Sequence, residues 1–319
     1  MTGTSIKAEV KHQLHGKNFL TLADFTQEEL MYLIDYGLQL KHEQKSGIPH
    51  RILEGKTLAM IFEKSSTRTR VSFEAGMFQL GGHALFLSKD ELQTGRGEEM
   101  ADTAKVISSY VDGILIRTFE HEIIEDLAGN ASVPVINGLT NDFHPCQVLA
   151  DLMTIYEQKG SLTDKKLAFI GDGNNMAHSL LIGCAIMGVD CSVGVPEGYE
   201  VNEDILALAK EKAKQSGAWI EQVHDPIAAV TNADVIYTDV WTSMGWEEEA
   251  EDRMEIFAAY QVNEALVAHA KNDYSFFHCL PAIRGEEVTA SIIDGPHSVV
   301  FDEAENRLHA QKAILASIL

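Results

Sequence analysis

The 319-residue sequence has few of the features that mark secreted or membrane-bound proteins. Its four cysteines are scattered along the chain, which argues against a disulfide framework. No run approaches the roughly 18 consecutive apolar residues of a membrane span. Residues 1–17 have neither the apolar stretch of a signal peptide nor the arginines of a transit sequence. We therefore expect a soluble, cytoplasmic protein.

Basic residues are also scarce, because 25 Lys and Arg stand against 48 Asp and Glu, a formal net charge of −23. A field of this sign repels phosphate backbones, so it argues against nucleic acid as a partner. A small anionic ligand must then be held by a local basic pocket. We interpret most of the acidic surplus, including the run from Glu247 to Asp252, as solvated surface.

Strand patterns alternate with helix patterns along the whole chain. Strand candidates occur at residues 57–62, 83–88, 112–118, 133–138, 166–173, 191–198, 234–241 and 276–282. Such alternation predicts an α/β fold with parallel sheets covered by helices on both faces. The length exceeds what one hydrophobic core usually supports, so we expect two doubly wound parallel-sheet domains linked by helices.

Helix patterns fill the segments between these strands. Apolar residues at Val71, Ala75 and Phe78 have helical spacing and predict a buried stripe on the helix that contains them. Further helices are expected at residues 146–159, 203–216, 263–270 and 305–319. We expect the first domain to comprise residues 1–150, the second residues 151–304, and helix 305–319 to pack back on the first.

The stretch SSTRTR (residues 65–70) follows the first strand candidate and begins a helix pattern. The first N–H groups of a helix lack intrahelical acceptors and carry partial positive charge, which suits a phosphate. The hydroxyls of Ser66, Thr67 and Thr69 add donors. The Arg68 guanidinium can bind two oxygens at once. A plain helix cap with solvated arginines is the alternative.

Arg117 ends an apolar strand candidate, where a charge requires either a ligand or a partner such as Glu120. His144 and Gln147 belong to the stretch HPCQ, which begins helix 146–159. A neutral imidazole and an amide suit a carbonyl group that develops negative charge. A structural cap is the alternative. Zinc at His144 and Cys146 would lack a second ligand pair, so we expect no metal.

In the second half, residues 170–176 (IGDGNNM) resemble a dinucleotide fingerprint, but Met176 stands where the third glycine belongs. A nicotinamide-dependent dehydrogenase, with Glu197 on the ribose, therefore stays an alternative. Asn174 and Asn175 instead suit a carboxylate or an amide.

Asp239 ends a strand candidate and can bind an ammonium group, and a loop with Ser243 and Met244 follows it. Cys279 stands beside His278 at the end of the last strand candidate. It is a candidate reactive thiol, and a small buried residue is the alternative.

In this order, the motifs resemble those of the aspartate/ornithine carbamoyltransferase family. They are SSTRTR (65–70), RTF (117–119), HPCQ (144–147), DVWTSMG (239–245) and HCLPA (278–282). They extend over nearly the whole chain, and none departs from the family pattern. The resemblance implies carbamoyl phosphate as one substrate and, from SMG with HCLP, L-ornithine as the other.

The resemblance further implies carbamoyl transfer to the δ-amino group of ornithine, giving L-citrulline and phosphate without a cofactor. It implies a homotrimer in which Gln93 reaches a neighbouring subunit's phosphate site. The implied carbamoyl phosphate site comprises Ser66, Thr67, Arg68, Thr69, Gln93, Arg117, His144, Gln147, Cys279, Leu280 and Arg307. The implied ornithine site comprises Asn175, Asp239, Ser243 and Met244. The implied catalytic residues are Arg68, Arg117, His144, Gln147 and Cys279.

Three other functions stay open at this point. One is carbamoyl transfer to a related amine such as putrescine or acetylornithine. The second is the dehydrogenase, and the third is a non-enzymatic protein that binds a phosphorylated metabolite. Neither the dehydrogenase nor the binding protein makes use of all the motifs.

Overall fold

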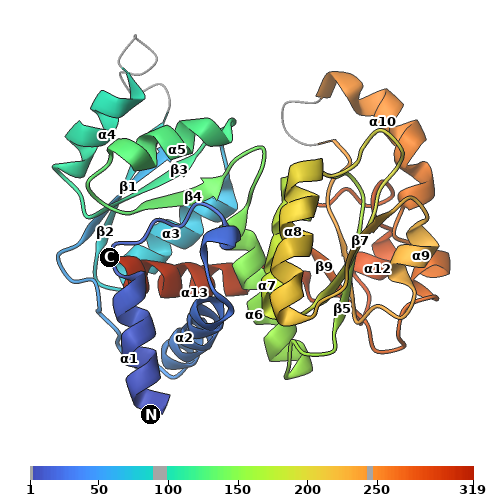
Figure 1. The fold of residues 1–319 in the computed structure, drawn as a ribbon, viewed down its shortest axis with the longest axis horizontal. Coiled ribbons are helices and arrows are strands. Elements are labelled where there is room, and N and C mark those ends of the chain that lie inside the picture. Colours follow the sequence, from blue (N-terminus) through green and yellow to red (C-terminus); the bar gives the residue numbers. More distant parts are fainter. Residues whose placement is uncertain (1–2, 89–98, 243–246) are drawn as a thin grey trace. The chain divides into compact units, whose positions relative to one another are not determined.

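The computed structural model describes residues 3–88, 99–242 and 247–319. The chain divides into two compact units (Figure 1). Unit 1 comprises Met1–Met153 with Glu305–Leu319, and unit 2 comprises Thr154–Ala304. Each unit is an α/β domain with its own parallel sheet, which confirms the predicted fold class.

Unit 1 is built on a four-stranded parallel sheet in the order β2-β1-β3-β4. Its strands are β1 (Thr57–Phe62), β2 (His83–Ser88), β3 (Gly113–Arg117) and β4 (Val135–Leu139). The central strands β1 and β3 are almost entirely buried, as their unbroken apolar sequences predict. The register pairs Phe62 with Arg117, so the segments after β1 and β3 leave the sheet at the same edge.

The helices of unit 1 precede, connect and follow these strands. They are α1 (Gly3–Leu14), α2 (Gln27–Lys45), α3 (Thr67–Gln79), α4 (Met100–Ser108), α5 (His121–Asn130) and most of α6 (Pro145–Lys159) and α13 (Val300–Ile318). Helix α2 begins at a capping box, in which Thr26 and Glu29 bond to each other's backbone N–H groups. Helix α13 reaches α2 and α3 through Lys312, whose ammonium group donates to Gln44 and Gln79.

The predicted stripe on α3 is wrong. The side chains of Val71 and Phe78 are 57% and 77% exposed, whereas Phe73 and Met77 are fully buried. Gly76 lies on the buried face, where a Cβ would stand only 3.3 Å from the Lys312 side chain. The buried face is therefore set by the close approach of α13, which the local apolar spacing does not reveal.

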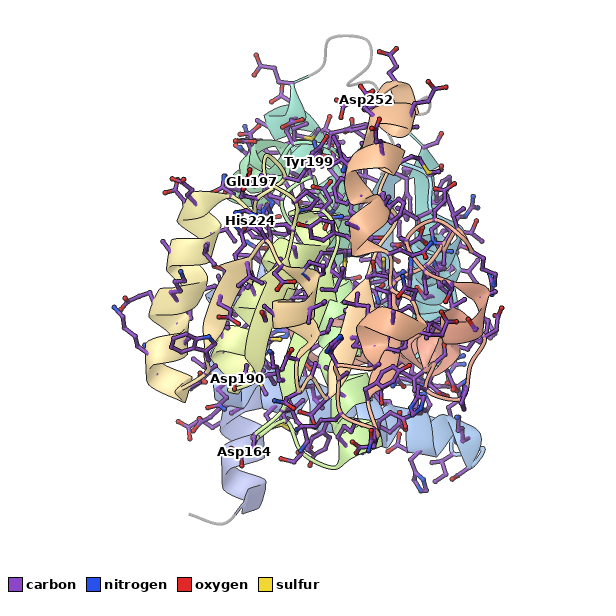
Figure 2. All side chains as sticks on the ribbon, turned by 90° about the vertical axis from the view of Figure 1, so that its right-hand side faces the viewer. Asp164, Asp190, Glu197, Tyr199, His224 and Asp252 are labelled. Carbon is purple, nitrogen blue, oxygen red and sulfur yellow. The ribbon has the colours of Figure 1, made fainter. Side chains whose placement is uncertain are left out.

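Unit 2 is built on a five-stranded parallel sheet in the order β7-β6-β5-β8-β9. Its strands are β5 (Lys166–Ile170), β6 (Asp190–Gly194), β7 (Ile220–Val223), β8 (Val235–Thr238) and β9 (Ser275–His278). Asp190 is the first residue of β6 and Glu197 follows its last residue, so the two mark the opposite ends of this strand (Figure 2). The strand order reverses between β5 and β8, and ligands of such sheets bind at the carboxyl ends beside the reversal.

The helices of unit 2 are α7 (Asn175–Met187), α8 (Glu203–Ser216), α9 (Pro226–Val230), α10 (Ala250–Phe257), α11 (Glu264–Val267) and α12 (Ala290–Ile293). Every residue of α7 from Met176 to Met187 is buried. The expected helix 263–270 is helical only over α11. The sequence pattern missed β7, because its four residues (IEQV) include two adjacent polar side chains and no apolar run.

Each unit has its own apolar core. In unit 1, strand residues Ile61, Ile114 and Ile116 pack with Ile124 and Leu127 of α5. In unit 2 the core gathers aromatic residues around β8 and β9, among them Trp241, Phe257, Tyr260, Tyr274 and Phe276. None of the helices that the structure describes has both the length and the apolar character needed to cross a bilayer.

Candidate active site

The start of α3 has the geometry of an anion site. Ser66 caps the helix, with an extended backbone and a hydroxyl that accepts a hydrogen bond from the Thr69 N–H at 3.2 Å. The first-turn N–H groups of Thr67 and Arg68 have no acceptor within the helix. No acidic residue stands in this turn to repel an anion. The hydroxyl-rich sequence predicts this cap, because serine and threonine favour such positions.

Arg307 adds a second guanidinium group to the start of α3. Its Nη2 donates a hydrogen bond to the Thr69 hydroxyl at 2.8 Å, and both residues are buried. Arg307 lies on α13, 238 positions further along the chain. No local pattern marks it, so only the family resemblance pointed to this residue.

Arg117 ends β3 as a buried residue. Its carbonyl oxygen accepts hydrogen bonds from the N–H groups of Glu63 at 2.9 Å and Lys64 at 3.4 Å. The connection between β1 and α3 is therefore bonded directly to the end of β3. Glu120, the surface partner considered for Arg117, accepts a hydrogen bond from Asn141 at 3.1 Å.

His144 lies immediately before Pro145, the first residue of α6, and is 5% exposed. Burial lowers the pKa of His144 well below its usual range. The positive charges of Arg307, Arg117 and Arg68 lower this pKa further, so all three guanidinium groups lie close enough to act on the ring. The imidazole is therefore neutral at pH 7 and lies in a strongly positive environment.

The remaining residues of HPCQ are buried beside it. The side-chain nitrogen of Gln147 donates to Asp151 at 2.8 Å, which fixes the orientation of the amide. The Cys146 thiol donates to the carbonyl of Asn137 at 3.3 Å. Burial raises the pKa of Cys146 to about 12, so this thiol stays protonated and is a packing residue.

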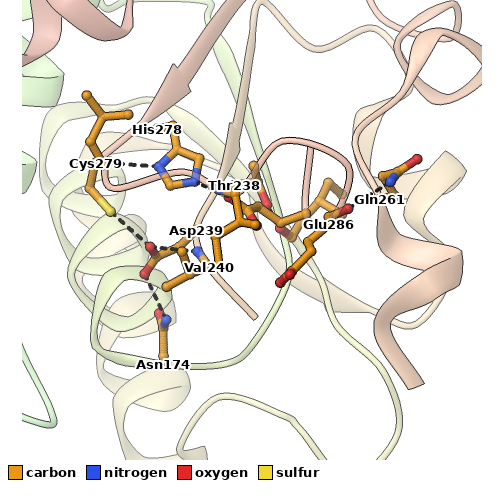
Figure 3. A network of polar contacts seen from close by, with 12 residues as sticks. Asn174, Thr238, Asp239, Val240, Gln261, His278, Cys279 and Glu286 are labelled. Atoms are coloured by element: carbon orange, nitrogen blue, oxygen red, sulfur yellow. Dashed lines mark hydrogen bonds and ion pairs between the residues drawn. The ribbon is translucent and has the colours of Figure 1, made fainter. Parts of the chain in front are cut away.

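In unit 2, polar side chains meet where the strand order reverses. Asn174 caps α7, because its side-chain oxygen accepts from the N–H groups of Met176 at 2.9 Å and Ala177 at 3.2 Å. Its side-chain nitrogen donates to Asp239 at 3.1 Å (Figure 3). Asn174 therefore joins the segments that follow β5 and β8. The candidate ligand Asn175 is the next residue, the first of α7.

Asp239 also contacts the end of β9. Its Oδ1 accepts hydrogen bonds from the Val240 N–H at 2.8 Å and from the Cys279 thiol at 3.1 Å (Figure 3). A thiol that donates to a carboxylate is protonated. In this arrangement Cys279 is a hydrogen-bond donor, and a thiolate nucleophile would lose this contact.

The turn after β9 is held by His278 and Glu287, which are both fully buried. The Nδ1 of His278 accepts from the Leu280 N–H at 2.9 Å, so the ring proton lies on Nε2 and donates to Glu287 at 3.0 Å. Glu287 also accepts from the Ile283 N–H at 2.7 Å. The sequence reasoning missed Glu287, because its polar neighbours give no sign that it is buried.

Asp239, His278 and Cys279 each place one possible metal-ligand atom within 4.8 Å of the others. Both ring nitrogens of His278 are already engaged, one by Leu280 and one by Glu287. A metal ion would have to displace these bonds. We therefore assign no metal site to this group.

Arg253 on α10 also connects the segments that follow β5 and β8, which Asn174 and Asp239 already join. It is buried, forms an ion pair with Asp172, and donates to the carbonyl of Trp241 at 2.6 Å. Its guanidinium carbon lies 4.9 Å from the centre of the Tyr199 ring. Burial raises the pKa of Asp172, and the charge of Arg253 opposes this rise. Arg253 directly follows the acidic run of residues 247–252, which was interpreted as solvated surface, so no sequence pattern indicated that Arg253 is buried.

The dinucleotide-like glycine at position 173 has a packing explanation. A Cβ on Gly173 would lie 2.4 Å from backbone atoms of Glu200 and Val201. Only glycine permits this approach. The spacing that resembled a nucleotide fingerprint is thus accounted for by contacts within the chain. Three predicted ligands, Gln93, Ser243 and Met244, lie outside the described residues.

Two family models match this chain. The carbamoyl-P binding domain of aspartate/ornithine carbamoyltransferases matches residues 17–157, and the Asp/Orn binding domain matches residues 163–318. The chain is 61% identical to the ornithine carbamoyltransferase of Anoxybacillus flavithermus over 96% of this chain and 98% of that protein. It is 62% identical to that of Bacillus subtilis over 96% and 95% of the two chains.

Solved structures agree with these similarities. The ornithine carbamoyltransferase from Pyrococcus furiosus superposes with a TM-score of 0.93 at 57% identity, covering 96% of this chain and 97% of that one. The corresponding protein from Campylobacter jejuni superposes with a TM-score of 0.88 at 44% identity, covering 94% and 97%. The chain therefore belongs to the aspartate/ornithine carbamoyltransferase family.

Proposed function

We propose that this chain transfers the carbamoyl group of carbamoyl phosphate to the δ-amino group of L-ornithine, giving L-citrulline and phosphate. One observation carries the proposal: a buried, neutral His144 lies within the electrostatic reach of Arg68, Arg117 and Arg307. It lies in the segment that matches the carbamoyl-P binding domain. The close relatives are named ornithine carbamoyltransferases, which supports ornithine as the acceptor.

The phosphate group of the substrate binds at the start of α3. The N–H groups of Thr67 and Arg68 donate to it together with the Ser66 hydroxyl and the Arg68 guanidinium. Thr69, whose hydroxyl is bonded to Arg307, orients that second guanidinium toward the same ligand. The partial positive charge at the helix start adds to the attraction.

The carbonyl oxygen of the substrate binds among His144, Arg68 and Arg117. Negative charge grows on this oxygen as the amine attacks, and donors fixed in advance stabilise it without reorganising. Removal of one such donor typically slows a reaction by about 100- to 1,000-fold. The amide of Gln147, oriented by Asp151, accepts from the carbamoyl nitrogen through its oxygen.

The chemistry needs no cofactor. The uncharged δ-amine forms a bond to the carbonyl carbon, and the bond from that carbon to the phosphate oxygen breaks. The amine loses one proton, and inorganic phosphate leaves with one proton more than the bound phosphoryl group carried. The enzyme therefore has to bind, orient and stabilise charge.

Ornithine binds in unit 2 at the carboxyl ends of the strands. Asn175 binds the α-carboxylate, and Asp239 binds the α-ammonium group together with Ser243. Met244 covers the side chain. Cys279 and the backbone of Leu280 flank the δ-amine. The contacts of Asp239 support this assignment, because they join it to Cys279 and to Asn174, the residue before Asn175.

We also propose a cytoplasmic homotrimer, acting in arginine metabolism, in which Gln93 completes a neighbouring subunit's phosphate site. Val71 and Phe78 on α3 and Leu85 on the edge strand β2 are large apolar residues exposed on the single chain, which supports an interface there. Sedimentation equilibrium should give three times the 35.2 kDa chain mass. A purely monomeric protein would contradict this part of the proposal.

A citrulline assay with ornithine, putrescine, acetylornithine and aspartate side by side tests the activity. We expect turnover with ornithine to exceed that with every other amine. Arg68→Ala should abolish turnover while the circular dichroism spectrum stays unchanged. Equal turnover with putrescine, or an active Arg68→Ala variant, would overturn the proposed substrate or the proposed phosphate site, respectively.

A further inference from the structure

Two backbone hydrogen bonds join the segment that follows β3 to the end of β4 and the segment after it. The N–H of Thr118 donates to the carbonyl of Leu139 at 3.1 Å, and the N–H of Asn141 donates to that of Phe119 at 2.7 Å. The first segment begins after Arg117, and the second ends at His144. Two residues proposed to contact the carbonyl oxygen are therefore carried by neighbouring segments whose positions depend on each other.

A histidine outside every motif above adds a side-chain link between them. His121 is the first residue of α5 and is buried. Its Nδ1 lies 3.1 Å from the Thr140 hydroxyl. Its ring stands edge-on to that of Phe143, with the ring centres 4.9 Å apart and the planes at 76°. Both partners belong to the turn that leads directly into His144.

The proton positions in this turn can be inferred from the distances. The Thr140 hydroxyl oxygen accepts from the Phe143 N–H at 3.1 Å. Its own proton can go to His121 Nδ1 at 3.1 Å or to the Phe143 carbonyl at 3.5 Å, and the shorter contact is favoured. From these two distances we assign His121 as the acceptor through Nδ1, with its proton on Nε2. Burial lowers the pKa of His121, which keeps the ring neutral as this bond requires.

We propose that His121 is a positioning residue for His144: it holds the turn of residues 140–143 so that the His144 ring keeps its place. The inference rests on the proposed role of His144 at the carbonyl oxygen. A displacement of a catalytic group by about 1 Å can cost about 100-fold in rate. Loss of the His121 contacts should accordingly lower kcat/KM for carbamoyl phosphate by about 10- to 100-fold.

Two variants separate the hydrogen bond from simple packing. His121→Leu removes the acceptor and keeps apolar bulk, whereas His121→Asn keeps an oxygen near the position of Nδ1. With saturating ornithine, His121→Leu should lose about 10- to 100-fold in kcat/KM for carbamoyl phosphate. His121→Asn should recover at least half of that loss on a logarithmic scale. If His121→Asn is no better than His121→Leu, or if His121→Leu stays within threefold of the parent, the inference is wrong.

His297 provides a matched control in unit 2. Its Nδ1 lies 2.9 Å from the carbonyl of Tyr274, and its ring stacks on the Tyr274 ring with centres 4.4 Å apart. His297→Leu therefore removes one hydrogen bond and one ring contact, as His121→Leu does. We expect both variants to lower the melting temperature, and only His121→Leu to change the kinetics. An equal kinetic loss in His297→Leu would show that general destabilisation is the cause.

A double-mutant cycle tests whether His121 acts through His144. In a His144→Ala background, His121→Leu should change kcat/KM by less than threefold, because the ring it positions is gone. An undiminished 10- to 100-fold loss there would overturn the inference. If His144→Ala itself costs nothing, the proposed role of His144 fails. If His144→Ala strongly lowers kcat/KM but His121→Leu leaves it unchanged, only the inference about His121 fails.

Discussion

Arg307 donates a hydrogen bond of 2.8 Å to the hydroxyl of Thr69, and this contact joins α13 to the first turn of α3. Thr69 is completely buried, so its hydroxyl is held by the protein and not by solvent. The proposed anion site at the start of α3 thus has a component from the far end of the chain. Its affinity for phosphate should depend on the geometry of that guanidinium group.

Arg307→Lys should raise KM for carbamoyl phosphate by about 10- to 100-fold. The planar guanidinium group can donate to Thr69 and to a phosphate oxygen at the same time, and an ammonium group cannot reproduce this geometry. Steady-state citrulline production measures this change. Arg51→Lys is the matched control, since Arg51 forms an exposed pair with Glu54 in unit 1. An unchanged KM in Arg307→Lys would remove Arg307 from the proposed phosphate site.

Local sequence patterns predicted every described strand except β7, and also the start of a helix at SSTRTR, because both depend on neighbouring residues. Buried strands require continuous apolar runs, and caps require a hydroxyl or an amide at one position. The contacts of Arg307, Glu287 and His121 could not be predicted in this way. Each contact depends on a partner that only folding brings near. Arg307, Glu287 and His121 are also polar residues with polar sequence neighbours, as is typical of the protein surface. The α3 stripe failed for the same reason, since α13 determines its buried face.

Cys279 should behave as a hydrogen-bond donor and not as a nucleophile. Cys279→Ser keeps a donor for Asp239 and should retain at least a tenth of the parent kcat/KM for ornithine. Cys279→Ala removes this donor, although the hydrogen bonds from Val240 and Asn174 to Asp239 remain, and it should lower kcat/KM for ornithine more than Cys279→Ser does. The citrulline assay compares the two, with Cys184→Ala, at a buried cysteine of α7, as the control. Complete inactivity of both Cys279 variants would favour a nucleophilic thiol.

The ion pair of Arg253 and Asp172 should be important for the stability of unit 2. Arg253→Met leaves a largely buried carboxylate without its partner, which typically costs about 3 kcal/mol or more of unfolding free energy. Urea unfolding measures this loss. Arg284→Met breaks the exposed pair with Asp294 and should cost far less, because solvent screens exposed charges. Asp172→Leu added to Arg253→Met should restore stability. Equal losses in Arg253→Met and Arg284→Met would contradict the prediction.

His309 should make the protein less stable in acid. Burial lowers the pKa of this histidine to about 4, whereas an unfolded histidine titrates near pH 6.5. Between about pH 6.5 and 4 the unfolded chain binds the additional proton and the folded chain does not. The unfolding free energy therefore falls as the pH falls, by at most about 1.4 kcal/mol per pH unit from this group.

Urea unfolding of the parent and of His309→Gln, at several pH values in that window, isolates this contribution. The slope of unfolding free energy against pH should be smaller in the variant. Parallel curves for the parent and His309→Gln would show that His309 titrates alike in the folded and unfolded states.

The nucleophile itself imposes a pH dependence on the reaction. An alkyl amine like that of ornithine has a pKa near 10, so only a small fraction is uncharged and reactive at neutral pH. Each unit of pH below that value removes about nine-tenths of the reactive form. If the protein binds the amine from this uncharged fraction, kcat/KM for ornithine must rise with pH through the neutral range.

Initial rates at saturating carbamoyl phosphate, measured from about pH 6 to pH 9, should therefore give a limb that rises up to tenfold per pH unit. His144 does not contribute a second limb in this range, because burial and the neighbouring arginines lower the pKa of its ring well below the usual value. The rising limb should accordingly persist in His144→Gln, at a lower absolute rate. A flat profile in the parent would mean that ornithine binds as the cation and loses its proton to a group on the protein, and that group would then have to be sought around Asp239 and Cys279.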